Sequence, residues 1–478
     1  MPSIVPASPM QPALLNRELS LLKFNERVLA MAEYDSTPLL ERLRYVCIVS
    51  SNLDEFFEIR ISSLKEQLAR NAHMVGPYGY TPGEAFDRVQ LATRQLVEKQ
   101  YSLLTNQILP KLAKEGIGLT DPLRWTEEQR LWAHEIFMRD VMPLLTPIGL
   151  DPAHPFPRVF NKSLNFIVAL SGEDAFGRPG HIAIVQAPRA LPRVITNLRL
   201  ALQGELSQRN FGAAVRLEVD HVIPQKLVAF LQQEFLLEPH DTYKVNGPVN
   251  LSRLMQVCNL VDRPELFFPD YRPRVPSPFA DISHHPSVIF DIIGKKDYLL
   301  HHPYQSFQPV LDFLVAAARD PGVVAIKQTI YRTGEDSELM AVLLAAAKAG
   351  KEVTVVVELM ARFDEQTNIN WASRLEEVGA HVSYGVVGHK THAKMALVLR
   401  REKGHIRRYG HLGTGNYHMR TTRLYTDFGL LTANPRMCED MDKVFSLLTG
   451  LGSRRPLQLL LQSPFTLHDT VIAQIGRA

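Results

Sequence analysis

A histidine and a lysine on alternate positions stand out in the run Lys390-Thr391-His392-Ala393-Lys394. The run reads as a turn entering a strand that covers residues 392–399, in which alternate side chains share a face. A neutral imidazole can attack phosphorus, and a neighbouring ammonium can stabilise charge on the transferring oxygens. The pair therefore predicts a covalent phosphate carrier at His392 with electrostatic support from Lys394. A structural histidine is the alternative for a strand histidine taken alone.

Two arginines follow predicted strands farther upstream. Arg332 comes after an expected strand at 323–331 and Arg362 after one at 353–359, with a helix at 336–348 between them. In a right-handed βαβ unit the parallel strands end at the same edge of the sheet, where ligands usually bind. Two guanidinium groups at that edge could converge on one polyanionic ligand. A solvated arginine at each strand end is the alternative.

A glycine-containing turn, Gly413-Thr414-Gly415-Asn416, follows an expected strand at 406–410 and would let the backbone approach a ligand closely. Simple chain reversal is the alternative. The sequence His-x-Lys followed by Gly-Thr-x-Asn resembles the half-site signature of the phospholipase D superfamily, in which a histidine becomes phosphorylated. The aspartate expected five residues after the lysine is absent, because Leu399 stands there. This departure disfavours a phosphodiesterase.

Other clusters give weaker signals. A zinc site built from histidines lacks a cysteine or carboxylate at ligand spacing; the histidines are His389, His392, His411 and His418. Four arginines flank an expected hairpin and either form a solvated tip or guide an anionic substrate; they are Arg400, Arg401, Arg407 and Arg408. The chain has no P-loop and no protein-kinase catalytic loop, so any use of ATP must follow another design.

The elements that would position these residues fall into several domains. Residues 1–13 are rich in proline and predict a flexible tail. Apolar residues at helical spacing predict a helical domain over 14–113, within which the cap-type residues Ser50 and Ser51 would open a new helix and leave Asn52 near its N-terminus. Short apolar runs at 164–170 and 181–185, among proline-rich turns, predict an α+β domain over 114–298.

The βαβ pattern predicts an α/β domain over residues 299–460. It includes a further helix at 370–378 and a strand at 381–386, and only residues 461–478 remain after it. The expected fold class is therefore multidomain, with a helical N-terminal bundle, an α+β domain and an α/β domain.

Composition limits the class of protein. A chain of 478 residues is too long for one ordinary core, and 45% hydrophobic with 22% charged residues is typical of folded globular proteins. The net charge of +3 means that local basic clusters must meet any anionic partner, and we expect no nucleic-acid partner. Three widely spaced cysteines fit a reducing compartment and predict a cytoplasmic protein, with peripheral membrane association left open.

Many separate motifs together resemble class 1 polyphosphate kinase along nearly the whole chain. They occur in the family's order: Asn16-Arg17-Glu18-Leu19-Ser20, Ser51-Asn52-Leu53-Asp54-Glu55-Phe56, His302-Pro303-Tyr304, Ile326-Lys327-Gln328-Thr329, Tyr331-Arg332-Thr333-Gly334, Glu358 with Ala361-Arg362-Phe363-Asp364-Glu365, the run Lys390 to Lys394, and Leu424-Tyr425-Thr426-Asp427.

The resemblance implies a phospholipase D-like α/β catalytic domain and reversible transfer of the terminal phosphate of ATP to inorganic polyphosphate through a phosphohistidine at His392. It implies ATP contacts for Asn52 and Tyr425, and places Arg332 and Arg362 where the family gathers phosphates and Mg²⁺. Because guanidinium has no lone pair to give, we interpret the two arginines as phosphate ligands beside the ion. It also suggests a homodimer.

Members of that family continue for roughly another domain, which supplies further arginine and histidine residues to the same tunnel. The resemblance therefore predicts that residues 461–478 begin a second catalytic domain that is missing here. Three functions stay open: a polyphosphate kinase, a non-catalytic fragment that binds ATP or polyphosphate, and a phospholipase D-like phosphodiesterase built from single half-sites.

Overall fold

The computed structural model describes residues 14–70, 75–119, 125–150, 156–170, 182–188, 191, 194, 214–280, 282, 287–331, 337–358, 365–386, 388–450 and 455–478. The predicted tail, residues 1–13, lies outside this set. The chain divides into two units, Met1–Pro269 and Asp270–Ala478, and each is described by itself. No helix in the described residues is both long and apolar enough to cross a bilayer.

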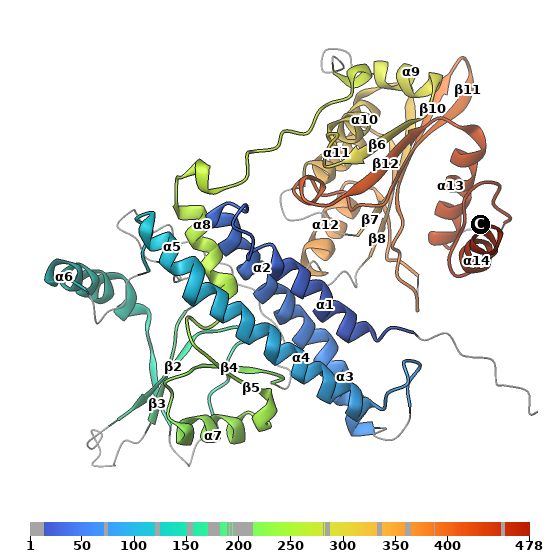
Figure 1. Cartoon of the computed structure of the whole chain (residues 1–478). Coiled ribbons are helices and arrows are strands. Elements are labelled where there is room, and N and C mark those ends of the chain that lie inside the picture. The colour runs from blue at the N-terminus through green and yellow to red at the C-terminus, as the bar shows by residue number, and fades with distance from the viewer. Residues whose placement is uncertain are drawn as a thin grey trace, which may run out of the picture. The chain divides into compact units, whose positions relative to one another are not determined.

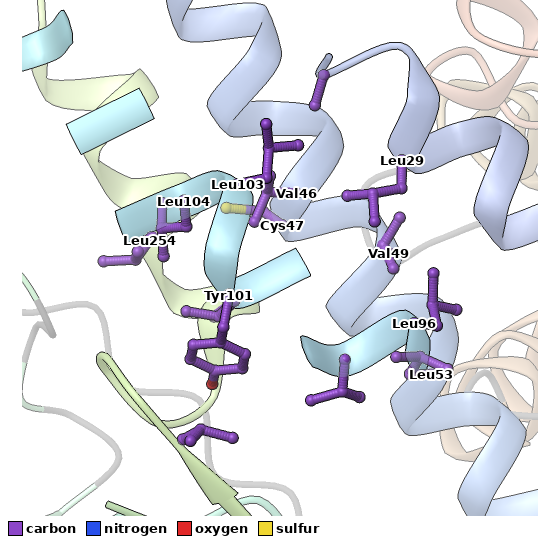
Figure 2. Packing of buried hydrophobic residues seen from close by; sticks show 14 of the residues in the cluster. Leu29, Val46, Cys47, Val49, Leu53, Leu96, Tyr101, Leu103, Leu104 and Leu254 are labelled. Atoms are coloured by element: carbon purple, nitrogen blue, oxygen red, sulfur yellow. The ribbon is translucent and has the colours of Figure 1, made fainter. Parts of the chain in front are cut away.

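The first unit begins with the predicted helical bundle (Figure 1). Its helices are α1 (Arg17–Ala30), α2 (Leu39–Phe56), α3 (Ser62–Arg70), α4 (Pro82–Leu103) and α5 (Leu109–Lys114), with π-helical turns at Phe57–Ile61 and Leu104–Ile108. Asn16 caps α1, and Thr81 with Glu84 forms a capping box on α4. The core lies between helices, where Leu29 of α1, Val49 of α2 and Leu96 of α4 are buried (Figure 2).

The predicted helix start at Ser50 is wrong. Helix α2 runs without interruption through Ser50, Ser51 and Asn52, so Asn52 lies within a helix and not at an N-terminus. Leu53 and Phe56, which follow, are buried in the bundle core. Packing of these apolar side chains overrides the local preference of serine and asparagine for caps.

The rest of the first unit is mixed α+β, as predicted. Strand β3 (Ile182–Gln186) pairs antiparallel with both β1 (Pro147–Gly149) and β2 (Asn165–Ala169). Strand β4 (Leu217–Asp220) pairs in parallel with β5 (Thr242–Val245). Three helices accompany them: α6 (Glu127–Ile136), α7 (Gln225–Glu234) and α8 (Met255–Leu260). Strands β2 and β3 confirm the apolar runs expected at 164–170 and 181–185.

The second unit is built on a seven-stranded sheet of order β6-β12-β11-β10-β7-β8-β9. Strands β7, β8 and β9 are parallel, which confirms the βαβ prediction, and the other neighbouring pairs are antiparallel. The strands are β6 (Tyr298–His302), β7 (Val323–Ile330), β8 (Glu352–Val357), β9 (His381–Ser383), β10 (Lys394–Glu402), β11 (His405–Gly413) and β12 (Asp427–Thr432).

Helices cover both faces of this sheet (Figure 1). One face carries α9 (Val288–Lys295), α10 (Gln308–Arg319), α11 (Glu338–Lys348) and α12 (Glu365–Glu377), and the other carries α13 (Pro435–Leu448). The side chains of Ala396 and Val398 of β10 are buried in the core on the face that carries α9 to α12. Those of Met395 and Leu397 pack on the other face, against α13. Residues 461–478 contain α14 (Leu467–Arg477), which has no buried side chain.

Several predicted bounds need correction. Strand β10 begins at Lys394, so His392 lies before the strand and not within it. The backbone groups next to His392 form hydrogen bonds with side chains instead of with a neighbouring strand. Strand β9 ends at Ser383, short of the predicted residue 386, and α12 starts at Glu365, earlier than predicted. Strand β11 runs to Gly413, because its antiparallel pairing with β12 continues to Gly429.

Candidate active site at one edge of the seven-stranded sheet

Three strands bring their ends to one edge of the sheet. Ile330, the last residue of β7, pairs with Val357, the last residue of β8. Strand β10 runs antiparallel to β7, with Ala396 opposite Gln328, so the N-terminal end of β10 reaches the same edge. The residues just beyond these ends are Tyr331, Glu358 and His392, which come from segments far apart in the sequence.

Asn368 of α12 ties two of these strand ends together. Its side-chain amide donates hydrogen bonds to the carbonyls of Tyr331 (3.0 Å) and Glu358 (2.9 Å). The buried carboxylate of Glu358 in turn accepts a hydrogen bond of 2.7 Å from the backbone amide of Thr391. These contacts fix the backbone that carries His392 relative to the ends of β7 and β8.

Thr329 holds the other side of His392. Its buried hydroxyl donates to the carbonyl of Ala393 (2.7 Å) and accepts from the amide of Met395 (2.9 Å). Both bonds join β7 to the start of β10 at backbone groups flanking Lys394. A buried side chain therefore continues the link between the strands toward the edge where His392 lies.

The ring of Tyr331 contacts both residues of the predicted catalytic pair. Its centroid lies 5.0 Å from that of His392 in an edge-on arrangement, and Nζ of Lys394 lies 4.9 Å from it. The same Nζ donates a hydrogen bond of 2.5 Å to the carbonyl of His392. The structure thus brings His392 and Lys394 together as predicted, although only Lys394 belongs to the strand.

The surroundings of His392 favour a neutral imidazole. Partial burial lowers the pKa of His392, and the positive charges of Lys394 and Lys390 lower it further, while the carboxylate of Glu358 acts in the opposite direction. The residue is exposed even so, whereas Lys394 is buried. An accessible, uncharged imidazole beside a buried cation can act as a nucleophile toward an anionic group.

The turn after β11 lies at the same edge of the sheet, since β11 is antiparallel to β10. The hydroxyl of Thr414 donates to Asp427 (2.9 Å) and accepts from the amide of Phe428 (2.8 Å). A Cβ at Gly415 would lie 2.4 Å from the carboxylate of Asp427, so a glycine is required there. Tyr425, 63% exposed, lies two residues before the start of β12 and therefore also at this edge.

A buried pair of histidines, His302 and His411, lies behind the turn, and no sequence motif marks the two as a pair. Nδ1 of His411 shares a hydrogen bond of 2.6 Å with Tyr417, and Nδ1 of His302 one of 2.9 Å with the carbonyl of Gln305. Both Nε2 atoms are buried without a hydrogen-bond partner, and both approach the position that a Cβ at Gly429 would take. Burial, together with a smaller effect of the charge of His302, lowers the pKa of His411 to about 3.

The remaining predicted residues are not joined to this edge by described contacts. Asn52 belongs to the first unit, where its side chain donates a hydrogen bond of 2.8 Å to Asn25 of α1. The π-helical turn Phe57–Ile61 follows it closely, a feature often found at functional sites. Arg332 and Arg362 lie outside the described residues.

Thr329, Tyr331, Glu358 and Asn368 are the site residues to which sequence reasoning gave no role. The first three lie inside motifs that carried the family resemblance, so their positions were marked while their functions were not. Asn368 sits in a helix with no motif, and only its contacts with two strand ends reveal it. In the described residues, no three side chains of the histidine, cysteine, aspartate or glutamate type gather as metal ligands would.

Comparisons with known proteins identify the family. Three domain models match: the polyphosphate kinase N-terminal domain at 14–120, the middle domain at 128–198 and 195–257, and C-terminal domain 1 at 288–454. Polyphosphate kinases of Burkholderia ambifaria and Paraburkholderia phytofirmans are 53% and 52% identical to the chain, each alignment covering 97% of it and 75% of the relative.

A solved structure agrees with the sequence comparison. The polyphosphate kinase from Porphyromonas gingivalis has a TM-score of 0.82 and 26% identity, over 97% of this chain and 74% of that one. The expected fold class is therefore confirmed, and so is the resemblance that the sequence motifs carry. The chain belongs to the class 1 polyphosphate kinase family.

Proposed function

We propose that His392 carries phosphate covalently between ATP and inorganic polyphosphate. A ring nitrogen attacks the terminal phosphorus of ATP, a nitrogen–phosphorus bond forms, and the bond to the bridging oxygen breaks to release ADP. A terminal oxygen of the polyphosphate chain then attacks the same phosphorus, which lengthens the chain by one unit and returns the neutral imidazole. The energy-rich phosphoramidate keeps both directions accessible.

The observation that carries this proposal is the exposed imidazole of His392 with Lys394 and Tyr331 against it. Because the pKa of His392 is lowered, the nitrogen lone pair stays available near neutral pH. The ammonium of Lys394 supplies positive charge to the phosphoryl oxygens, which is the main catalytic need of phosphoryl transfer. Tyr331, Thr329 and Glu358 position the pair through the contacts described above.

The nucleotide and the phosphate chain need further contacts. We assign Asn52 and Tyr425 to ATP and Arg332 and Arg362 to phosphates, following the family's motifs. The exposure of the Tyr425 ring at the His392 edge of the sheet supports its part in this assignment. An exposed tyrosine ring offers an apolar face for a base and a hydroxyl for hydrogen bonding.

Mg²⁺ is expected to accompany the nucleotide. Within the described part of the chain, Glu358 is the one carboxylate whose charge acts on His392, and it is 4% exposed and already accepts from Thr391. The described residues around His392 therefore do not provide a set of side chains arranged to bind Mg²⁺. Because Mg²⁺ is usually held by substrate phosphates and water with few carboxylates, it would enter with ATP and neutralise its phosphates.

We further propose a cytoplasmic homodimer. The three cysteines are free and buried, which supports a reducing compartment. The homodimer rests on the family resemblance alone.

A labelling experiment tests the phosphohistidine. The protein is incubated with ATP labelled at the terminal phosphate, and protein-bound label is tested for the acid lability and base stability of a phosphoramidate. Wild type is compared with His392→Ala and with His381→Ala, an exposed histidine that begins β9 at the opposite edge of the sheet. We expect label in wild type and in His381→Ala only.

The other outcomes separate the remaining functions. Label that survives His392→Ala would overturn the assignment of the nucleophile. Binding of ATP and polyphosphate without label in any variant would identify a non-catalytic module. Release of product from a phosphodiester substrate would favour the phosphodiesterase, which the leucine at 399 disfavours.

A further inference from the structure

The second unit has an open cavity of about 850 Å³ that the proposed reaction does not use. Its lining comes from the C-terminal end of α9 and the residues after it, the start of β11, the segment after β12, one side of α13 and Arg455 beyond that helix. Ile406, Arg407 and Arg408 contribute from β11, so two of the four hairpin arginines noted in the sequence line it.

Positive charge predominates in the lining. Six described lining residues are cationic and three are acidic; the cations are Lys295, Lys296, Arg407, Arg408, Lys443 and Arg455, and the acids are Asp297, Glu439 and Asp442. A cavity with an excess of one charge concentrates ligands of the opposite charge.

Two of the three acidic residues form ion pairs, and the third accepts a hydrogen bond from a neutral hydroxyl. Asp442 pairs with Arg408 (3.1 Å) and with Lys327 (2.6 Å), and Glu439 pairs with Lys443 (3.0 Å). Asp297 accepts a hydrogen bond of 2.6 Å from the hydroxyl of Thr432.

Three cations remain available for a ligand. In the described part of the chain, no carboxylate lies within ion-pair distance of Lys295, Lys296 or Arg455, and all three are exposed. The ammonium of Lys296 lies 5.0 Å from the ring centroid of Tyr298, which leaves its charge unneutralised. The cavity therefore presents uncompensated positive charge to solvent.

The cavity lies at the edge of the sheet opposite to His392. Strand β10 runs from Lys394 to Glu402, and Arg407 and Arg408 pair with Arg400 and Leu399 near its far end. The five residue steps from Lys394 to Leu399, at about 3.3 Å each, place these arginines roughly 17 Å along the strand from the end at which His392 lies. The cavity is thus distinct from the site around His392.

The lining favours an inorganic anion over a nucleotide. None of the described lining residues is aromatic, and the apolar contributions are the aliphatic side chains of Ile293, Ile406, Ala433 and Pro435. Lysine and arginine side chains spread over the cavity suit a ligand with repeated negative charges, since each cation can meet a separate phosphate.

We propose that this cavity is a second binding site for the inorganic polyphosphate chain, held chiefly by Lys295, Lys296 and Arg455. The inference rests on the proposed function for the identity of the polyanion, because polyphosphate is its substrate. A chain bound here is held away from His392, so the site retains long chains between transfer events and leaves the chemical step untouched.

Protection of lysines from acetylation locates the site directly. The full chain carrying His392→Ala is treated with an amine-acetylating reagent with and without long-chain polyphosphate, and modified lysines are identified by mass spectrometry. We expect protection of Lys295 and Lys296 and none of Lys348, an exposed lysine at the end of α11. Unprotected Lys295 and Lys296 would overturn the proposal. The result is independent of whether His392 accepts phosphate.

A matched pair of variants tests the energetics. Lys295→Gln/Arg455→Gln is compared with Lys348→Gln/Arg319→Gln, which removes the same charges from exposed positions at the ends of α11 and α10. The cavity variant should bind long-chain polyphosphate about fivefold more weakly. It should bind a non-hydrolysable ATP analogue and transfer phosphate to His392 as wild type does. An equal loss in both variants would show a general charge effect, and an unchanged affinity in the cavity variant would show no site; either contradicts the proposal.

Discussion

The backbone amide of Thr391 donates a hydrogen bond of 2.7 Å to Oε2 of Glu358, a residue 33 positions earlier in the chain. The bond joins the end of β8 to the segment that carries His392. The same carboxylate raises the pKa of His392, against the larger lowering by burial and by the neighbouring lysines. One buried side chain therefore both holds the backbone of the nucleophile and influences its protonation.

Glu358→Gln separates these two roles. Glutamine keeps an oxygen that can accept from Thr391 but loses the charge, so the pKa of His392 should fall further and the acid limb of phosphoenzyme formation should move to lower pH. Glu358→Ala leaves the buried amide unpaired and should cost about 1–3 kcal/mol of unfolding free energy. NMR titration of His392 and chemical denaturation measure the two effects. A pKa of His392 that rises in Glu358→Gln would contradict the first.

Lys394→Gln should shift the pKa of His392 in the direction opposite to Glu358→Gln. Removing the ammonium takes away a positive charge that lowers the pKa of His392, so this pKa should rise and the acid limb should move to higher pH. Loss of charge stabilisation should slow labelling of His392 by roughly 10²- to 10³-fold. Lys394→Arg keeps the charge and should retain the lowered pKa. Equal titration of His392 in wild type and Lys394→Gln would exclude the electrostatic role.

Thr329→Val tests the hydroxyl that bonds to Ala393 and Met395. Valine has a similar shape, but it leaves the carbonyl of Ala393 and the buried amide of Met395 without this partner, which should cost about 1–3 kcal/mol. Thr329→Ser keeps the hydroxyl and serves as the control. Because Thr329 positions the backbone on both sides of Lys394, labelling should slow in the valine variant at unchanged pKa of His392. A valine variant as stable and active as the serine variant would contradict this role.

His411 should make the second unit sensitive to acid. Its pKa is about 3 in the folded protein and about 6.5 in an unfolded chain. Between pH 7 and pH 5 the unfolded state therefore binds a proton that the folded state does not bind. Stability contributed by this group is present above pH 6.5 and is lost as the pH falls, by about 2 kcal/mol between pH 7 and pH 5. Denaturation at both pH values should show a smaller loss for His411→Gln. If NMR showed that His411 takes up a proton between pH 7 and pH 5 in the folded protein, the lowered pKa would be contradicted.

The sequence by itself determined the repeating strand and helix pattern of the second unit, the family, and the pairing of His392 with Lys394. These signals are local, since hydrophobic periodicity and motif spacing act over a few residues. The prediction of a helix start at Ser50 was wrong because it also relied on local preferences alone. Serine and asparagine favour caps locally, but burial of Leu53 and Phe56 in the bundle keeps α2 helical through Asn52.

Only the tertiary structure decided how the site is held together. Thr329 bonds to Met395 across 66 residues of sequence, and this contact depends on the register in which β7 and β10 pair. The approach of His302 and His411 to Gly429 likewise requires β6, β12 and β11 to lie side by side. Such contacts are set by strand pairing over long sequence distances, and no local pattern of residues encodes them.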